Sequence, residues 1–291
     1  MLSIVITAYK EPGTIGKVIE CFTKQKIKDY ELLALCPDKE TAEVIKKYSK
    51  NNKKVKYIKD LGKGKPSALN IAFKKAKGDI LVLSDGDVFV SDNSVNALLR
   101  HFKDKKVGAV TGKPVSISER DNMLGYWSHL LTDAAHKTRV NREGKYIDCS
   151  GYLYAIRNII KGIPKDSLSD DAVISHIIWK KGYRIRYEPK AEVYVKYPSS
   201  FKDWIKQKKR STGGYNQITK WCGKTERMRS FSREIIFGWY KALSYPKSFK
   251  EFFWTLVLFA ARLYLWILIY IDINIKKESF EKTWKRVEST K

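Results

Sequence analysis

The sequence predicts an α/β protein in which a nucleotide-binding type of sheet is flanked by helices and followed by C-terminal membrane-associated helices. Three observations lead to this prediction. Apolar runs of strand length alternate with helical patterns through roughly the first 120 residues. One of these runs, residues 80–83, stops abruptly at two carboxylates, Asp85 and Asp87. Near the C-terminus, residues 252–271 form an apolar segment with a single charge.

The first four strands are short apolar runs, each of which stops at polar, proline or glycine residues. They cover residues 2–8, 31–36, 55–58 and 80–83. The helices between them carry apolar residues at intervals of three and four, and they cover residues 15–22, 41–48 and 65–77. Because strands that alternate with helices return in the same direction, we expect parallel pairing with right-handed crossovers.

The later elements follow from the same two periodicities. They are a helix over 93–102, a strand over 107–117, a helix over 119–142, a strand and turn over 146–156, and short strands over 183–187 and 193–197. A further helix begins with Asp170 and Asp171. Capping and the helix dipole favour an aspartate at a helix start, which explains one of these two acids without requiring both.

The charge balance points to an anionic partner. A formal net charge of +26 suits nucleic acid, phosphorylated small molecules or an acidic membrane surface. The four cysteines form no C-x-x-C pair, so we expect free thiols in a reducing compartment. The N-terminus enters a strand pattern without a basic region or cleavage site, so it does not read as a signal peptide. We therefore expect most of the protein to lie in the cytoplasm.

Asp85 and Asp87 form the candidate metal site. They follow the end of a buried strand, the sheet edge at which open α/β folds bind ligands, and Gly86 leaves room between them. Two carboxylates in this position suit an oxygen-loving divalent cation that also holds phosphates. The alternative is an ordinary polar turn, in which aspartate and glycine are common.

Residues 252–271 predict membrane attachment. The segment is twenty residues long with Arg262 as its only charge, and as a helix it would span about 30 Å. Its apolar residues favour insertion by several kcal/mol, which exceeds the cost of about 2.5 to 3.5 kcal/mol for a central arginine. The alternative is a buried core helix. Both flanks of this segment are basic, and residues 235–243 predict an aromatic-rich helix at the level of the lipid headgroups. We therefore expect membrane attachment through residues 231–275, either by a helix that crosses the bilayer or by one that lies in its interface.

Taken together, these motifs resemble family 2 glycosyltransferases of the GT-A fold, which are inverting enzymes that use a nucleotide-diphosphate sugar. The resemblance covers roughly residues 2–215. It rests on Thr7 to Glu11, Pro37-Asp38, Gly62 to Lys65 with Ala68-Leu69-Asn70, Asp85-Gly86-Asp87, Gly151 with Ala155 and Arg157, Asp170-Asp171, and Gln207 to Arg210.

The resemblance implies a donor site. The residues that would bind the donor nucleoside are Thr7, Ala8, Tyr9, Glu11 and Asp38. Lys65 would lie near the phosphates and Asp85 near the ribose or sugar. Asp87 would bind Mn²⁺ or Mg²⁺, which stabilises the charge that builds on the leaving diphosphate.

The resemblance also implies an acceptor side. Asp171 matches the family's general base, while Gly151 and Asp170 would lie beside the acceptor. Gln207 and Arg210 would lie near the diphosphate, as in the Gln-x-x-Arg-Trp motif of processive relatives. Ser211 replaces the tryptophan of that motif, which favours the addition of one sugar or a few over polymer synthesis.

The expected acceptor is a glycan hydroxyl or a lipid-linked molecule at the cytoplasmic face of the cell membrane, whose anionic lipids would hold the protein. The expected domains are a catalytic domain over 1–230, a membrane-associated segment over 231–275 and a basic tail over 276–291.

One alternative function is that of a sugar nucleotidyltransferase. Such an enzyme would show a glycine-rich phosphate loop near the N-terminus, where residues 8–13 hold only Gly13. The other is a non-enzymatic basic protein that binds membranes or nucleic acid. We expect no nucleic-acid partner, because no groove-reading motif is present.

Overall fold

A computed structural model describes residues 1–223, 226, 228 and 242–272. Its strands are β1 (Leu2–Thr7), β2 (Tyr30–Cys36), β3 (Val55–Lys59), β4 (Ile80–Asp85), β5 (Phe89–Val90), β6 (Val107–Ser116), β7 (Leu153–Arg157) and β8 (Arg184–Val195). Its helices are α1 (Ile15–Thr23), α2 (Lys39–Asn51), α3 (Lys65–Lys75), α4 (Ser94–Leu99), the 3₁₀ helix η1 (Arg100–Lys103), α5 (Met123–Val140), α6 (Asp170–Lys180), α7 (Phe201–Cys222) and α10 (Phe249–Tyr270). The predicted α/β class is confirmed.

The eight strands form one sheet in the order β3-β2-β1-β4-β7-β6-β8-β5. The first four strands in this order pair in parallel, as the alternation of strands and helices predicts. β7 breaks the parallel pattern, because it pairs antiparallel with both β4 and β6. The expectation of parallel pairing for the first four strands is therefore confirmed, and β6 and β8 also pair in parallel. An apolar run indicates a strand but carries no information about its direction.

Three predicted strand segments differ from the observed strands. Of residues 146–156, only the last part is a strand, since β7 starts at Leu153. The two short strands expected at 183–187 and 193–197 are one strand, β8, which pairs with β6 through two register shifts. Pro189 lies within the second irregular stretch. A proline cannot donate to the ladder and is tolerated at such bulges.

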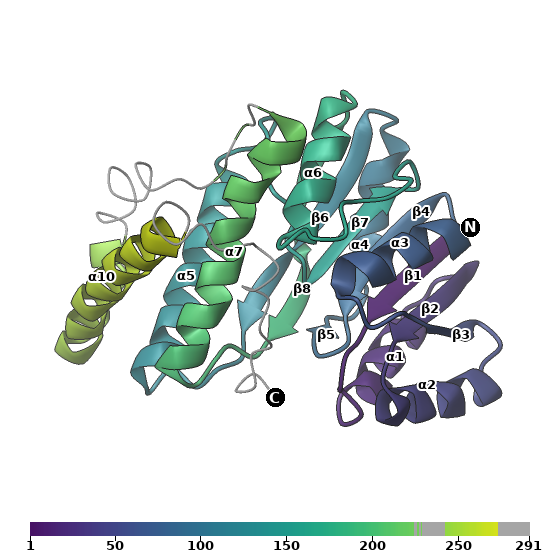
Figure 1. Ribbon diagram of the computed structural model, residues 1–291, viewed down its shortest axis with the longest axis horizontal. Helices are drawn as coiled ribbons and strands as arrows, with labels where there is room; N and C mark the ends of the chain where they lie inside the picture. The colour runs from purple at the N-terminus through teal and green to yellow at the C-terminus, as the bar shows by residue number, and fades with distance from the viewer. Residues whose placement is uncertain (224–225, 227, 229–241, 273–291) are drawn as a thin grey trace.

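Helices cover both faces of the sheet (Figure 1). Ile4 and Ile6 of β1 pack on the side of α1 and α4, whereas Val5 packs on the side of α3 and α6. Because successive side chains of a strand point to opposite faces, both faces bury apolar residues. Burial on both faces explains why strands such as β1 and β4 are apolar at nearly every position rather than at every second one.

A third apolar cluster joins α5, α7 and α10 at one end of the molecule (Figure 1). Polar contacts fix α10 on α5: the Trp127 indole donates to the carbonyl of Trp254 at 2.7 Å, and the hydroxyls of Tyr126 and Thr255 lie 2.7 Å apart. Arg120 forms a two-pronged ion pair with Glu251. The expected C-terminal apolar helix is therefore present, and it packs on the rest of the protein along one side.

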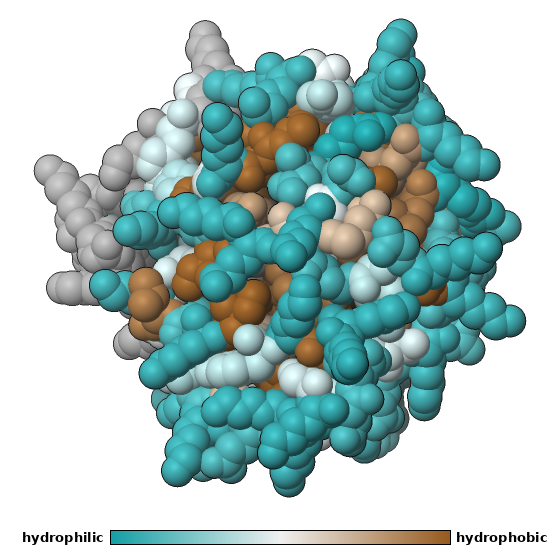
Figure 2. All heavy atoms as spheres, turned by 90° about the vertical axis from the view of Figure 1, so that its right-hand side faces the viewer, coloured by the Kyte–Doolittle hydropathy of each residue, from teal (hydrophilic) through white to brown (hydrophobic). Residues whose placement is uncertain are grey.

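The other side of α10 is exposed and apolar. Phe253 is 63% exposed and Leu263 is 55% exposed, and Leu256, Ile267 and Tyr270 continue the same stripe. Within the described residues, α10 is the one helix long and apolar enough to cross a membrane. The face of the molecule at the opposite end from α10 is mostly hydrophilic (Figure 2). The helix predicted over 235–243 lies outside the described residues up to residue 241.

Candidate active site

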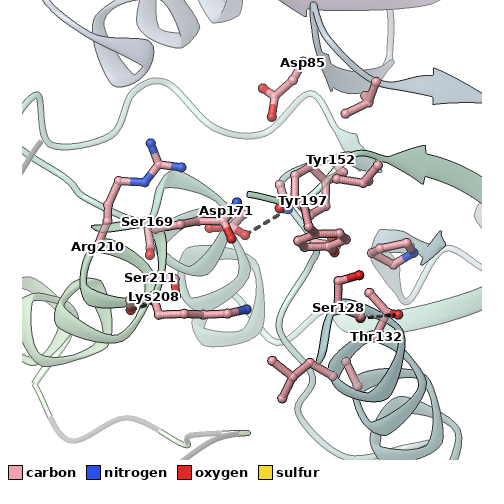
Figure 3. Close-up of a pocket in the computed structure, with 18 of the residues that line it drawn as sticks. Asp85, Ser128, Thr132, Tyr152, Ser169, Asp171, Tyr197, Lys208, Arg210 and Ser211 are labelled. Atoms are coloured by element: carbon pink, nitrogen blue, oxygen red, sulfur yellow. Dashed lines mark hydrogen bonds between the residues drawn. The ribbon is translucent and has the colours of Figure 1, made fainter. Parts of the chain in front are cut away.

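A cavity of about 1110 Å³ lies at the carboxyl ends of the parallel strands and extends to α5, α7 and α10. Asp85, Asp87 and Asp171 all line it. Asp85 is the last residue of β4, Asp87 follows this strand, and Asp171 lies in the first turn of α6. The fold thus brings together acids that are more than eighty residues apart in the sequence. Figure 3 shows Asp171 pointing into the space between the strand that carries Asp85 and the helix that carries Arg210.

The turn from Asp85 to Asp87 is held against β1 and its loop. The Gly86 amide donates to the Thr7 carbonyl at 2.9 Å, and the Thr14 hydroxyl donates to the Gly86 carbonyl at 2.9 Å. A Cβ at position 86 would lie 2.5 Å from Oε2 of Glu11 and 2.6 Å from Cβ of Ala8. Only glycine therefore allows this close approach, which fixes the direction in which the two flanking carboxylates leave the backbone.

Lys65 connects the two groups of acids. Its Nζ lies 2.7 Å from Oδ1 of Asp85 and 3.4 Å from Oδ2 of Asp170. Burial alone would lower the pKa of Lys65, but the charges of Asp170 and Asp85 outweigh it and raise the pKa. The lysine therefore stays charged. Burial raises the pKa of Asp85 against the opposing charge of Lys65.

Asp171 is held in a fixed orientation by two backbone amides. Gly151 donates to its Oδ2 at 2.9 Å, and Ala172 donates to its Oδ1 at 2.9 Å. Burial, followed by the charge of Asp170, raises the pKa of Asp171 to about 6. A carboxylate with a pKa near the working pH can both hold its charge and accept a proton, as a general base must.

Asp87 is the acid that best fits a metal. Burial, followed by the charge of Asp85, raises its pKa to about 6, so a cation would relieve an unfavourable concentration of negative charge. Its oxygens are the hard ligands that Mn²⁺ and Mg²⁺ accept. Among the described residues, no three histidine, cysteine or acidic side chains are grouped as a metal site. In the described part of the chain, Asp87 would hold the cation with few further protein ligands, and a bound diphosphate and water would supply the rest, as is usual for Mg²⁺.

Most residues predicted for the donor and acceptor sites line the same cavity. From the strand ends and loops come Thr7, Ala8, Tyr9, Glu11 and Gly151, and from the helices come Lys65, Asp170, Gln207 and Arg210. Asp38 is the exception among the predicted residues. Its carboxylate caps α2 by accepting from the Thr41 amide at 3.0 Å, and it also accepts from the Lys10 amide at 2.8 Å. The contact of Asp38 with the nucleobase of the donor therefore stays a prediction.

Sequence reasoning missed several lining residues. Asp60 lies directly after β3, is buried and has a pKa raised by burial. An acid after a strand is the same signal that singled out Asp85, so it was available in the sequence. Tyr152 and Tyr197 also line the cavity, with ring centroids 6.2 Å apart in an edge-on arrangement. No local sequence pattern predicts that these tyrosines line the cavity, because the contact between their rings depends on how β7 and β8 lie relative to each other.

Comparisons with known proteins indicate the family and the fold of this chain. The family model described as "Glycosyltransferase like family 2" matches residues 1–214. The poly-beta-1,6-N-acetyl-D-glucosamine synthase of Staphylococcus aureus is 25% identical over 257 residues, which cover 81% of this chain. The chain spans only 60% of the length of that relative.

Two solved structures share the fold. The mannosyltransferase PcManGT from Pyrobaculum calidifontis, in complex with GDP-Man and Mn²⁺, matches with a TM-score of 0.62 at 18% identity over 97% of this chain and 82% of its own. GalNAc-T7 with UDP, GalNAc and Mn²⁺ matches with a TM-score of 0.52 at 17% identity over 84% of this chain and 57% of its own. Likeness at this level of identity concerns the fold alone, and it confirms the GT-A fold predicted from the sequence.

Proposed function

Because the chain belongs to the glycosyltransferase-like family 2, we propose that it moves a sugar from a nucleotide-diphosphate sugar to an acceptor hydroxyl with inversion at the anomeric carbon. The observation that carries this proposal is the convergence of Asp85, Asp87 and Asp171 on one cavity. That arrangement offers acids for a metal and a diphosphate beside a separate, oriented base. The names of the matched structures, which include GDP-Man, UDP and Mn²⁺, support the donor class and the metal.

The donor side of the reaction uses the residues at the strand ends. Asp87 would hold Mn²⁺ or Mg²⁺, and the cation would act as a Lewis acid that stabilises the diphosphate as it leaves. Lys65 supplies a fixed positive charge beside Asp85 and Asp170. Arg210 and Gln207 add a cation and an amide from α7. Such preorganised charges stabilise the leaving group because they need no reorientation during the reaction.

The acceptor side depends on Asp171. Its carboxylate takes the proton from the acceptor hydroxyl as the oxygen attacks the anomeric carbon. The amides of Gly151 and Ala172 hold the carboxylate in place, so its orientation costs no entropy in the transition state. One base and one displacement give a product of inverted anomeric configuration.

Nucleotide release tests this proposal. Purified protein is incubated with a panel of UDP- and GDP-sugars and Mn²⁺, and the release of UDP or GDP is followed with and without simple glycoside acceptors. We expect release from one donor or a few, its loss with EDTA, and an inverted anomeric proton signal in the NMR spectrum of the product. A panel in which no donor is consumed and none raises the melting temperature would contradict the proposal, since bound ligands stabilise by mass action.

We further assign residues 1–230 to the catalytic domain, 231–275 to membrane attachment and 276–291 to a basic tail, with the catalytic domain in the cytoplasm. The exposed apolar stripe of α10 supports the attachment. Because its other side is fixed to α5 by the contacts of Trp127 and Tyr126, α10 would lie in the membrane interface beside the catalytic domain. Anionic lipids would add attraction for a chain with a net charge of +26.

Flotation with liposomes tests this attachment. We expect the full chain to float with vesicles that contain anionic lipid, and the double variant Phe253→Glu, Ile267→Glu to remain largely in the soluble fraction. Both residues are exposed, so the folded state should be retained, which circular dichroism checks. Leu61→Glu is the matched control, because Leu61 is exposed and follows β3, a strand at the opposite side of the molecule from α10 (Figure 1). Equal flotation of the control and the double variant would refute the assignment of the stripe.

A further inference from the structure

The end of β3 carries an acid that the proposed reaction does not use. Asp60 directly follows this strand, lines the active-site cavity and is only 7% exposed. Within the described part of the chain, its carboxylate accepts one hydrogen bond, from the Gly62 amide to Oδ1 at 2.6 Å, and forms no ion pair. Burial of a carboxylate with so few partners is costly. Oδ2 is therefore available to a ligand in the cavity that donates hydrogen bonds.

The backbone holds Asp60 in place without a ligand. Its amide donates to the Cys36 carbonyl at 3.3 Å, which ties the end of β3 to the end of β2. Gly62 has a φ of +65°, and a Cβ at this position would lie 3.4 Å from Cβ of Pro37. The turn after β3 thus packs against the loop after β2. A carboxylate that is oriented before binding loses little conformational entropy when a ligand arrives.

The charges around Asp60 disfavour a phosphate. Burial raises the pKa of Asp60, and the negative charge of Asp38 adds to this effect. Asp38 itself accepts from the Thr41 amide at 3.0 Å and from the Lys10 amide at 2.8 Å. Two acids repel an anion, whereas N–H groups form strong hydrogen bonds with a charged carboxylate. This end of the cavity therefore suits a neutral group that carries N–H donors.

The distance along the sheet suits a nucleoside diphosphate. Asp60 follows β3 and Asp85 ends β4, and the order β3-β2-β1-β4 places three strand spacings between them (Figure 1), or about 14 Å. Both acids lie at the carboxyl ends of parallel strands and line the same cavity. This separation is comparable to the length of an extended nucleoside diphosphate. With the diphosphate near Asp85 and Asp87, the base reaches Asp60.

The chemistry of a carboxylate distinguishes among the bases. A carboxylate offers two acceptor oxygens in one plane and can accept two parallel N–H bonds. Guanine presents N1–H and its amino group side by side, which matches this geometry. Uracil presents N3–H between two carbonyl oxygens, and adenine and cytosine present an amino group beside a ring nitrogen with a lone pair. Each of these three bases sets an acceptor against the carboxylate, which is repulsive.

We propose that the carboxylate of Asp60 accepts hydrogen bonds from N1–H and the amino group of guanine, so that the sugar donor is a guanosine diphosphate sugar. This inference rests on the proposed function and specifies its donor. Asp60 selects the base and takes no part in the making or breaking of bonds. Its role is thus separate from those of Asp87 and Asp171.

Nucleotide binding without any sugar provides the test. The full chain with Mn²⁺ is titrated by calorimetry with GDP, UDP and inosine diphosphate, which lacks the amino group of guanine. The diphosphate and the metal are common to all three, so differences in affinity report on the base. We expect GDP to bind about 10- to 100-fold more tightly than either of the others, the scale of a hydrogen bond to a charged group. This comparison needs no variant.

Asp60→Asn gives a second readout. Xanthosine diphosphate carries a carbonyl where guanine has its amino group, and the amide of asparagine can donate to that carbonyl. The variant should bind GDP about 10- to 100-fold more weakly than the wild type does, and it should prefer xanthosine diphosphate to GDP. Asp92→Asn is the matched control, because Asp92 is exposed and does not line the cavity. It should keep the preference for GDP.

Two outcomes overturn the inference. One is wild-type protein that binds GDP no more tightly than UDP or inosine diphosphate. The other is an Asp60→Asn variant that binds all four nucleotides more weakly by the same factor, as the loss of a purely structural contact would cause. Consumption of a UDP-sugar in preference to GDP-sugars would count against this inference alone, whereas a guanine preference without consumption of any donor counts against the proposed function.

Discussion

Replacement of Asp171 by asparagine is expected to lower the rate of sugar transfer about 10²- to 10⁴-fold, the usual contribution of a general base. Asparagine keeps the shape of the side chain and can accept one of the two backbone hydrogen bonds, but it cannot take a proton. Donor binding should persist, because the proposed donor contacts come from other residues. Transfer rates and a donor titration by thermal shift measure the two effects separately.

The pH profile gives this prediction a second readout. The base works only when deprotonated, and the pKa of Asp171 is raised to about 6. Wild-type kcat/KM should therefore fall as the pH drops through about 6 and level off above it, and Asp171→Asn should lack this limb. Asp104→Asn is the control, since Asp104 is exposed and does not line the cavity. Normal turnover by the Asp171→Asn variant would show that Asp171 is not the general base.

Replacement of Asp87 by asparagine is expected to remove the response to Mn²⁺. For wild-type protein, Mn²⁺ together with UDP or GDP should raise the melting temperature, because a ligand that binds only the folded state stabilises it. Asp87→Asn should lose most of this rise and about 10²- to 10³-fold in transfer rate, the scale observed when a preorganised charge-stabilising group is lost. Differential scanning fluorimetry and nucleotide release provide the two measurements.

The matched control for the metal site is Asp92→Asn. Asp92 is exposed, lies five residues further along the chain and does not line the cavity. Its variant should respond to Mn²⁺ as the wild type does. If Asp87→Asn kept a full Mn²⁺ response and full activity, the metal would bind elsewhere or play no part, and the assignment of Asp87 would be wrong.

The acidic residues of the site show how much of it local sequence patterns can predict. Asp85 and Asp171 could be chosen from the sequence because each adjoins a strong periodic pattern, a strand end in one case and a helix start in the other. The same reasoning passed over Asp60, which follows a shorter and more polar strand, β3. The family resemblance implied a donor contact for Asp38, whose position after a strand is equally consistent with the helix cap that it forms. A polar residue between a strand and a helix serves either role, and spacing alone does not distinguish them.

The sequence by itself determined the alternation of strands and helices, the acids at their ends and the apolar helix near the C-terminus. These features depend on residues within a few positions of one another, whose spacing records the two- and 3.6-residue periods of the backbone. Only the tertiary structure decided that β7 runs antiparallel, that Lys65 bridges Asp85 and Asp170, and that α10 has one side packed and one exposed. These features arise from contacts between distant segments, and strand order and direction leave no trace in local periodicity.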